Sequence, residues 1–219
     1  MKKIIPLLAV ASALLMVNLV LAQDPNSERV STLIDIRNDF ILSEKGENQT
    51  GQSMKVLWQY KWIGGFLESD YKSKNHALTI KPSFLLKQGP WYFLGGASTN
   101  SQGSDFVQAG VWYLNSFGKF NIFLDLRNYW SVSDKENGYT DNLLRVMYPI
   151  GGKFSAGFDL YYDHWWNQPS HNWFLVGPRV KYQLTKKINI YLRVSHEWDV
   201  FNGKTGGTDR IITGIQIFF

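Results

Sequence analysis

The chain of 219 residues contains no cysteine, so it has neither a disulfide framework nor a thiolate site. Its formal net charge of +5 comes without a lysine-rich run or a basic tail, and nucleic acid is therefore not expected as a partner. Beyond residue 22 no apolar run is long enough for a membrane-spanning helix. No Pro/Ser-rich linker or low-complexity segment divides the chain. We therefore expect one domain held together without covalent cross-links.

The one long apolar run lies at the start of the chain. Two lysines are followed by an apolar stretch from Ile4 to Leu21, which ends at the small residue Ala22. This pattern predicts a cleaved secretory signal peptide over residues 1–22 and a single exported domain over residues 23–219. A retained membrane anchor is the alternative, but the run is short for one and contains a proline.

Long segments of the exported domain alternate apolar and polar residues with a period of two. This pattern is clear in Lys119–Ser131, Lys153–Asp163 and Lys187–Trp198. A period of two indicates β-strands. Strands of soluble sandwiches are usually about five or six residues long, whereas these run to about ten or more, as strands that cross a membrane at a tilt require. A Trp-rich soluble β-protein is the alternative.

The connections between these segments also alternate in length. Short ones occur at Lys87–Pro90, Ser116–Gly118, Gly151–Gly152 and Thr185–Lys186, and longer polar ones at Ser98–Ser104, Val132–Tyr139, His164–His171 and Asp199–Gly207. Outer-membrane barrels have short periplasmic turns and longer outer loops. We predict an all-β fold, a single antiparallel transmembrane β-barrel of about twelve strands. That number includes a weak strand at Phe66–Lys74 after a turn at Gly64–Gly65, and without this hairpin it falls to ten.

The end of the chain and its tryptophans indicate that the barrel lies in a bacterial outer membrane. Residues 211–219 alternate and finish in Phe219, which resembles the C-terminal signal of bacterial outer-membrane barrels. Tryptophans near strand ends are typical of the aromatic girdles at membrane interfaces, and the candidates are Trp58, Trp62, Trp91, Trp112, Trp130, Trp165 and Trp198. We expect a bacterial outer-membrane protein in contact with lipid and lipopolysaccharide, and the sequence leaves protein partners open.

Strand parity predicts which way the charged side chains point. The apolar residues that would face lipid in this segment are Phe120, Ile122, Leu124 and Leu126. Asp125 and Arg127 must then face the barrel interior, because an arginine at the lipid midplane costs about 2–4 kcal/mol. The same parity places these charged residues inside: Arg37, Lys55, Lys81, Arg127, Arg145, Arg179, Lys181, Arg193 and Arg210, with Asp35, Asp39, Asp125, Asp159, Asp163 and Glu197.

Aromatic side chains on the same face add ring surfaces to this interior. Phe123, Tyr129, Tyr161, Trp173 and Tyr191 have inward parity. We expect a narrow pore that passes small polar solutes by facilitated diffusion, through weak binding at several positions. The predicted solute-binding residues are Arg127, Tyr129, Arg145, Asp159, Tyr161, Asp163, Arg179, Tyr191 and Arg193. The alternative is a closed structural barrel in which these residues form a salt-bridged plug.

Residues 128–165, NYWSVSDKENGYTDNLLRVMYPIGGKFSAGFDLYYDHW, resemble a central segment of the Tsx-like nucleoside-channel family of outer-membrane barrels. The shared features are an acidic loop ending in Gly138-Tyr139, a strand leading into Pro149-Ile150-Gly151-Gly152, and a strand ending in Asp163-His164-Trp165. The resemblance implies a barrel of about twelve strands that passes nucleosides by stacking them on lumenal aromatics. The oligogalacturonate-specific channels have a similar length and a basic lumen, so acidic sugars are the rival substrate class.

Some small outer-membrane barrels are lipid hydrolases, which gives the triplet Ser195-His196-Glu197 a possible catalytic role. Neighbouring strand residues point to opposite faces, so Ser195 and His196 would lie on different sides of the sheet, although a histidine from another strand remains possible. The loop between His164 and His171 lacks the further ligands typical of a metal site. We expect no enzyme activity, no catalytic residues, no metal and no cofactor.

Overall fold

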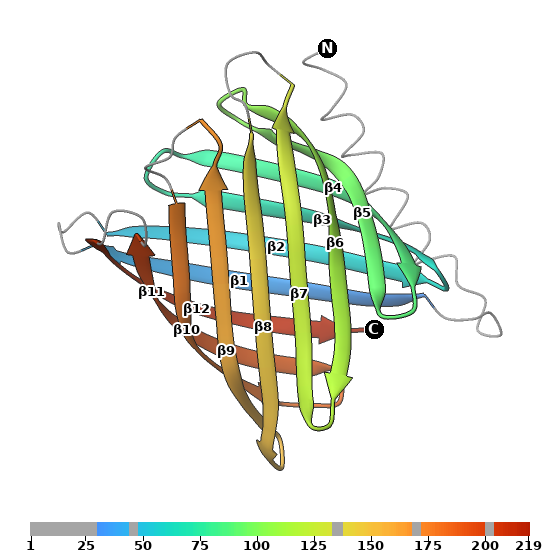
Figure 1. The fold of residues 1–219 in the computed structure, drawn as a ribbon. Coiled ribbons are helices and arrows are strands. Elements are labelled where there is room, and N and C mark those ends of the chain that lie inside the picture. Colours follow the sequence, from blue (N-terminus) through green and yellow to red (C-terminus); the bar gives the residue numbers. More distant parts are fainter. Residues whose placement is uncertain (1–29, 44–47, 133–137, 168–171, 200–203) are drawn as a thin grey trace.

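The strands of the chain form one closed antiparallel barrel (Figure 1). The computed structural model describes residues 30–43, 48–132, 138–167, 172–199 and 204–219, so the predicted signal peptide over 1–22 lies outside the described residues. The described part contains twelve strands: β1 (Ser31–Ser43), β2 (Gln49–Tyr60), β3 (Ile63–Lys72), β4 (Ala77–Gln88), β5 (Trp91–Asn100), β6 (Asp105–Phe117), β7 (Phe120–Ser131), β8 (Tyr139–Gly151), β9 (Phe154–Trp165), β10 (Asn172–Gln183), β11 (Ile188–Asp199) and β12 (Lys204–Phe218). Each strand pairs with its sequence neighbour, and β1 closes the barrel against β12. The predicted fold class and the strand number of twelve are confirmed.

Strand lengths and turns give the barrel two distinct ends. At one end the connections are tight, as at Gly118–Lys119 and Gly152–Lys153, where the glycines have φ values of 59° and 55°. Such positive φ angles favour glycine over residues with a Cβ atom. β1 begins and β12 finishes at this same end. By the rule for outer-membrane barrels this is the periplasmic end, and the longer connections lie outside.

One predicted turn is wrong. Gly64 and Gly65 lie inside β3, and the turn between β2 and β3 is formed by Lys61 and Trp62. A Cβ atom on Gly65 would meet the indole of Trp58 on the neighbouring strand. Gly65 therefore makes room for a bulky cross-strand neighbour, whereas a Cβ atom on Gly64 would meet the backbone oxygen of Trp58 at 2.7 Å. The longer outer connection predicted at Ser98–Ser104 also shortens, because β5 continues to Asn100.

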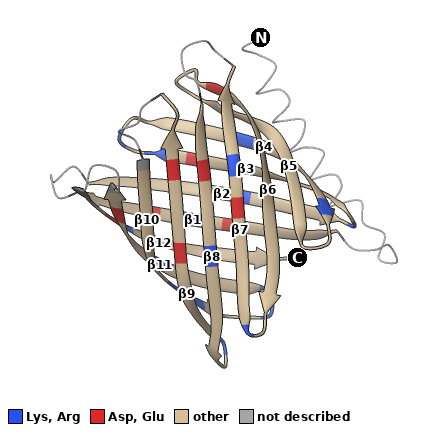
Figure 2. Cartoon of the chain, viewed as in Figure 1, with Lys and Arg blue, Asp and Glu red and all other residues tan. Residues whose placement is uncertain are grey.

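The strands present apolar side chains outward along their length. On β11, Ile190, Leu192 and Val194 are 40%, 44% and 42% exposed, whereas the alternating residues Tyr191 and Arg193 are buried. Figure 2 shows charged residues within the strands, between long uncharged stretches. No helix among the described residues is long and apolar enough to span a membrane. The exposed apolar faces of the strands therefore form the surface that meets lipid.

Three residues depart from the predicted lipid-side pattern. Trp112 is buried and pairs directly with the lumenal residue Asp125, and Trp165 lines the interior, so these two tryptophans do not belong to the interfacial girdle. Trp62, Trp91, Trp130 and Trp198 are exposed, as a girdle requires. Ile122 borders the lumen close to the periplasmic rim, where residues of both strand faces bound the cavity.

Candidate solute pathway

The barrel interior contains two cavities that share part of their lining. The inner chamber, towards the periplasmic end, has a volume of about 680 Å³, and the outer chamber has about 490 Å³. Five residues line both of them: Arg37, Asp141, Tyr161, Arg193 and Ile212. We call this set the neck. A solute that crosses the barrel has to pass these side chains.

The parity argument placed the charged residues on the correct side of the sheet. Thirteen of the fifteen charged residues predicted to face the interior line one or both chambers. Asp159 lies fully buried beneath that lining, and Glu197 pairs with the outer-chamber residue Leu175 across β10 and β11. The cost of placing charge against lipid thus determines the face that each strand turns inward.

A cluster of arginines surrounds Asp159 on the wall formed by β8 to β11. Arg145 donates two hydrogen bonds to the carboxylate, from Nε to Oδ1 at 2.8 Å and from Nη2 to Oδ2 at 2.9 Å. Arg179 donates from Nη1 to Oδ2 at 3.2 Å, and Nη1 of Arg193 lies 3.6 Å from the same oxygen. One carboxylate therefore serves three guanidinium groups.

This wall carries more positive charge than its single carboxylate balances. Lys181, on the same face of β10 as Arg179, makes no hydrogen bond or ion pair with any residue that the structure describes. We call Arg145, Arg179, Lys181 and Arg193 the cationic wall. The lining of the inner chamber has seven lysines and arginines against four aspartates and glutamates, and the buried Asp159 offsets one more cation. The lining of the outer chamber is nearly balanced, with five cations and four carboxylates.

Two tyrosines are fixed beside the cationic wall. The guanidinium carbon of Arg179 lies 3.7 Å from the ring centroid of Tyr191, and that of Arg193 lies 4.4 Å from the ring centroid of Tyr161. The Tyr191 hydroxyl donates to Asp35 Oδ1 at 2.8 Å. These cation–π contacts orient the arginines within the chamber.

The opposite side of the lumen is organised around Glu68, which the sequence did not identify as a lumenal residue. Lys55 Nζ lies 2.5 Å from Glu68 Oε2, and Lys81, Arg37 and Arg127 reach the same carboxylate within 3.7–3.9 Å. Arg127 also donates to Asp125 at 2.8 Å. Lys81 also pairs with Asp70 at 3.1 Å, and Arg127 with Asp141 at 3.7 Å, so four carboxylates face four cations and this part of the lumen contributes little net charge.

Arg127 and Tyr129, two of the predicted binding residues, are held in this balanced network. Tyr129 is fully buried, its ring stacks on Tyr139 at 4.3 Å, and its hydroxyl accepts a hydrogen bond from Arg127 Nη1 at 2.9 Å. Its ring has no exposed face for a solute. Asp163 lies elsewhere, in the lining of the outer chamber. The members of the predicted set that line the inner chamber are Arg127, Arg145, Tyr161, Arg179, Tyr191 and Arg193, and Asp159 is buried behind them.

Apolar side chains narrow the lumen on the β3 to β7 side. Phe66, Leu85, Leu94 and Trp112 form a buried cluster inside the barrel, with Leu57, Tyr92 and Phe123 packed against it. The pathway is therefore displaced towards the cationic wall.

The triplet considered for catalysis is split between the two faces of β11. The Ser195 hydroxyl is buried and has no hydrogen-bond partner among the described residues. His196 is partly exposed, and its Nδ1 lies 2.8 Å from Asp209 Oδ1. The histidine and its carboxylate partner thus lie on the other face from the serine.

Comparisons with solved structures identify the same architecture. No protein-family model and no curated protein matches the sequence. The structure resembles a KdgM porin in complex with disordered oligogalacturonate, with a TM-score of 0.63 and 12% identity over 85% of this chain and 99% of that one. It also resembles the NanC porin, with a TM-score of 0.59 and 16% identity over 84% and 98% of the two chains. An outer-membrane channel from Pseudomonas putida F1 matches with a TM-score of 0.55 and 10% identity over 90% and 100%.

These likenesses show the fold: the chain is a twelve-stranded β-barrel of the bacterial outer-membrane type. They do not confirm the resemblance to the Tsx-like family.

Proposed function

We propose that the protein is an outer-membrane channel that passes small anionic solutes, with acidic sugars among the candidates. The observation that carries this proposal is the cationic wall, on which three arginines share one carboxylate and Lys181 has no acidic partner among the described residues. Fixed positive charge within low-dielectric walls raises the local concentration of anions. Weak binding at successive basic groups lets a solute enter and leave, as conduction requires.

This charge distribution favours acidic solutes over the nucleosides that the sequence suggested. A neutral nucleoside gains nothing from the uncompensated charge of Lys181 and its neighbours. Tyr161 and Tyr191 could stack on a base, but an arginine already covers one face of each ring. The KdgM porin structure, which contains oligogalacturonate, is an example of a similar barrel that binds an acidic sugar chain.

A closed structural barrel is the competing proposal, because the Glu68 network and the apolar cluster fill part of the lumen. A catalytic barrel has less support, since Ser195 has no base beside it among the described residues.

Planar-bilayer recordings test the channel. Under a KCl gradient we expect unitary conductance and a reversal potential that indicates preference for chloride. Lys181→Gln should lower the chloride-to-potassium permeability ratio by about twofold to fivefold, since one unpaired charge is lost from a screened aqueous cavity. The matched variant Lys181→Arg keeps the charge and should keep the ratio. Absence of conductance, or preference for potassium, would refute the proposal.

A further inference from the structure

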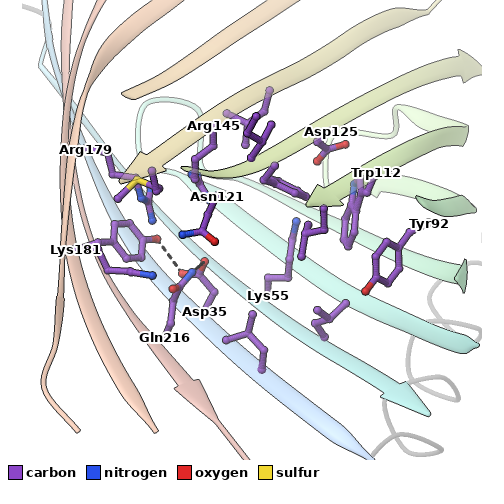
Figure 3. A pocket seen from close by; sticks show the side chains of 18 of the residues that line it. Asp35, Lys55, Tyr92, Trp112, Asn121, Asp125, Arg145, Arg179, Lys181 and Gln216 are labelled. Carbon is purple, nitrogen blue, oxygen red and sulfur yellow. Dashed lines mark hydrogen bonds between the residues drawn. The ribbon is translucent and has the colours of Figure 1, made fainter. Parts of the chain in front are cut away.

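The inner chamber has two chemically different walls. On one side is the cationic wall of β8 to β11. On the other side lie Tyr92, Trp112 and Phe123, from β5, β6 and β7, which we call the aromatic wall. In Figure 3, Arg179 and Lys181 lie on one side of the cavity and Tyr92 and Trp112 on the other. A solute in this chamber meets fixed positive charge and apolar ring surface together.

The aromatic wall is held in place from behind. The Trp112 ring stacks on the fully buried Phe66, with centroids 5.0 Å apart and planes inclined by 15°. Phe123 packs edge-on against Trp112 at 5.7 Å. Leu85 belongs to the same buried cluster. The rings are therefore a preformed surface with little freedom to rearrange when a solute arrives.

The charges beside the aromatic wall are already matched. Lys55 pairs with Glu68 at 2.5 Å, and Asp125 accepts a hydrogen bond from Arg127 at 2.8 Å. A polar solute gains little there, because these groups already have partners. Lys55 Nζ lies over the Trp112 ring at 5.4 Å and Lys87 Nζ over the Tyr92 ring at 5.5 Å, so the aromatic wall presents carbon to the chamber chiefly at the partly exposed Phe123.

The two walls join at one pair of neighbouring residues. Phe123 on β7 and Arg145 on β8 are direct cross-strand partners, and the guanidinium carbon of Arg145 lies 5.9 Å from the Phe123 ring centroid. A flat ring seated on Phe123 would place an attached carboxylate beside Arg145, on the cationic wall that also carries the unpaired ammonium of Lys181.

We infer that the inner chamber selects anions that carry an apolar ring, and that aromatic carboxylates are its preferred solutes. This inference rests on the proposed anion channel and specifies its substrate class. Ring packing on an aromatic side chain adds free energy beyond the charge interaction. A sugar acid in the same position would bring hydroxyl groups against carbon and leave them without hydrogen bonds, which disfavours it. The aromatic wall therefore distinguishes aromatic carboxylates from sugar acids, and the cationic wall selects anions over cations.

Blocking measurements on the full-length protein in planar bilayers test this inference. Benzoate and galacturonate are compared as blockers of chloride current, since each carries one carboxylate on a six-membered ring and only one of the rings is apolar. We expect benzoate to block at a concentration lower by about tenfold or more, which corresponds to roughly one well-placed ring contact. Phe123→Leu keeps an apolar side chain but removes the ring, and should raise the blocking concentration of benzoate by about threefold to tenfold with little effect on galacturonate.

Phe93→Leu is the matched control, because Phe93 is 47% exposed on the outer surface of β5 and does not line the chamber. It should leave both blocking concentrations unchanged. Equal block by benzoate and galacturonate, or insensitivity of benzoate block to Phe123→Leu, would overturn the inference while chloride preference persisted. If the channel lacked chloride preference altogether, the proposed function would fail first, so the two failures are distinguishable.

Discussion

Arg145 and Asp159 face each other across β8 and β9 as direct register partners, joined by two hydrogen bonds of 2.8 and 2.9 Å. Asp159 is fully buried, and it also receives Arg179 and lies near Arg193. Asp159 therefore anchors the arginines of the cationic wall, and its negative charge lowers the net positive charge of that wall.

Replacing Asp159 with asparagine tests both roles. Three guanidinium groups would lose their shared carboxylate, and breaking a buried ion pair from one side costs about 3–5 kcal/mol. We expect Asp159→Asn to lower the free energy of unfolding, measured by urea titration in lipid vesicles. Folded Asp159→Asn protein should show a stronger preference for chloride, because the cationic wall gains one net positive charge.

Asp209→Asn is the control for that change, because its carboxylate is 60% exposed and, among the described residues, forms an ion pair only with the partly exposed His196. Exposed pairs contribute about 0–1 kcal/mol. Equal stability of the two variants would contradict the anchoring role of Asp159.

Much of the barrel was predictable because lipid imposes a strict rule on each strand. In β7, Asp125 and Arg127 could only face inward, and both are buried in the lumen. The same rule gave the correct face for β10 and β11 from Arg179 and Arg193. Periodicity and the cost of burying charge in lipid therefore determined fold class, strand number and lumenal charge.

The rule that charged side chains face away from lipid predicted less about β3 and about the contacts of the aromatic residues. β3 has glycines at its start, places Phe66 inward, and turns Ser69 towards the other face, so its sequence alternates weakly and Glu68 was overlooked. The rings of Phe66 and Trp112 come from strands three apart, and their stacking depends on the curvature of the closed barrel. Parity gives the face of a side chain, but not its contacts with distant strands, and so Tyr129 was expected to be open to solute.

The outward face of β7 gives a second prediction. Leu126 is 40% exposed beside the buried Arg127 and has outward parity. Leu126→Arg should destabilise the barrel in lipid vesicles by about 2–4 kcal/mol, the cost of a lipid-facing arginine near the midplane. Asn121→Arg is the comparison, because Asn121 is exposed in the rim of the inner chamber and an arginine there can reach water. If both variants unfolded at the same urea concentration, the assignment of the β7 faces would be wrong.

Gly214 and Tyr191 give a third prediction, which concerns the shape of the cationic wall. The two residues are direct partners across β11 and β12, and a Cβ atom on Gly214 would overlap the Tyr191 ring. Displacing that ring would break its hydrogen bond to Asp35 and its contact with Arg179. We expect Gly214→Ala to lower the free energy of unfolding by about 1–3 kcal/mol, as overpacking does in other proteins.

A double-mutant cycle separates this clash from a general effect of alanine on the strand. In a Tyr191→Ala background the ring is absent, so Gly214→Ala should cost far less, and it could even stabilise β12 because glycine is unfavourable within a strand. The measurement is the free energy of unfolding of the four proteins in lipid vesicles. A cost of Gly214→Ala that was the same with and without the tyrosine ring would show that the two residues are not coupled, and that Gly214 serves some purpose other than seating the ring that supports Arg179.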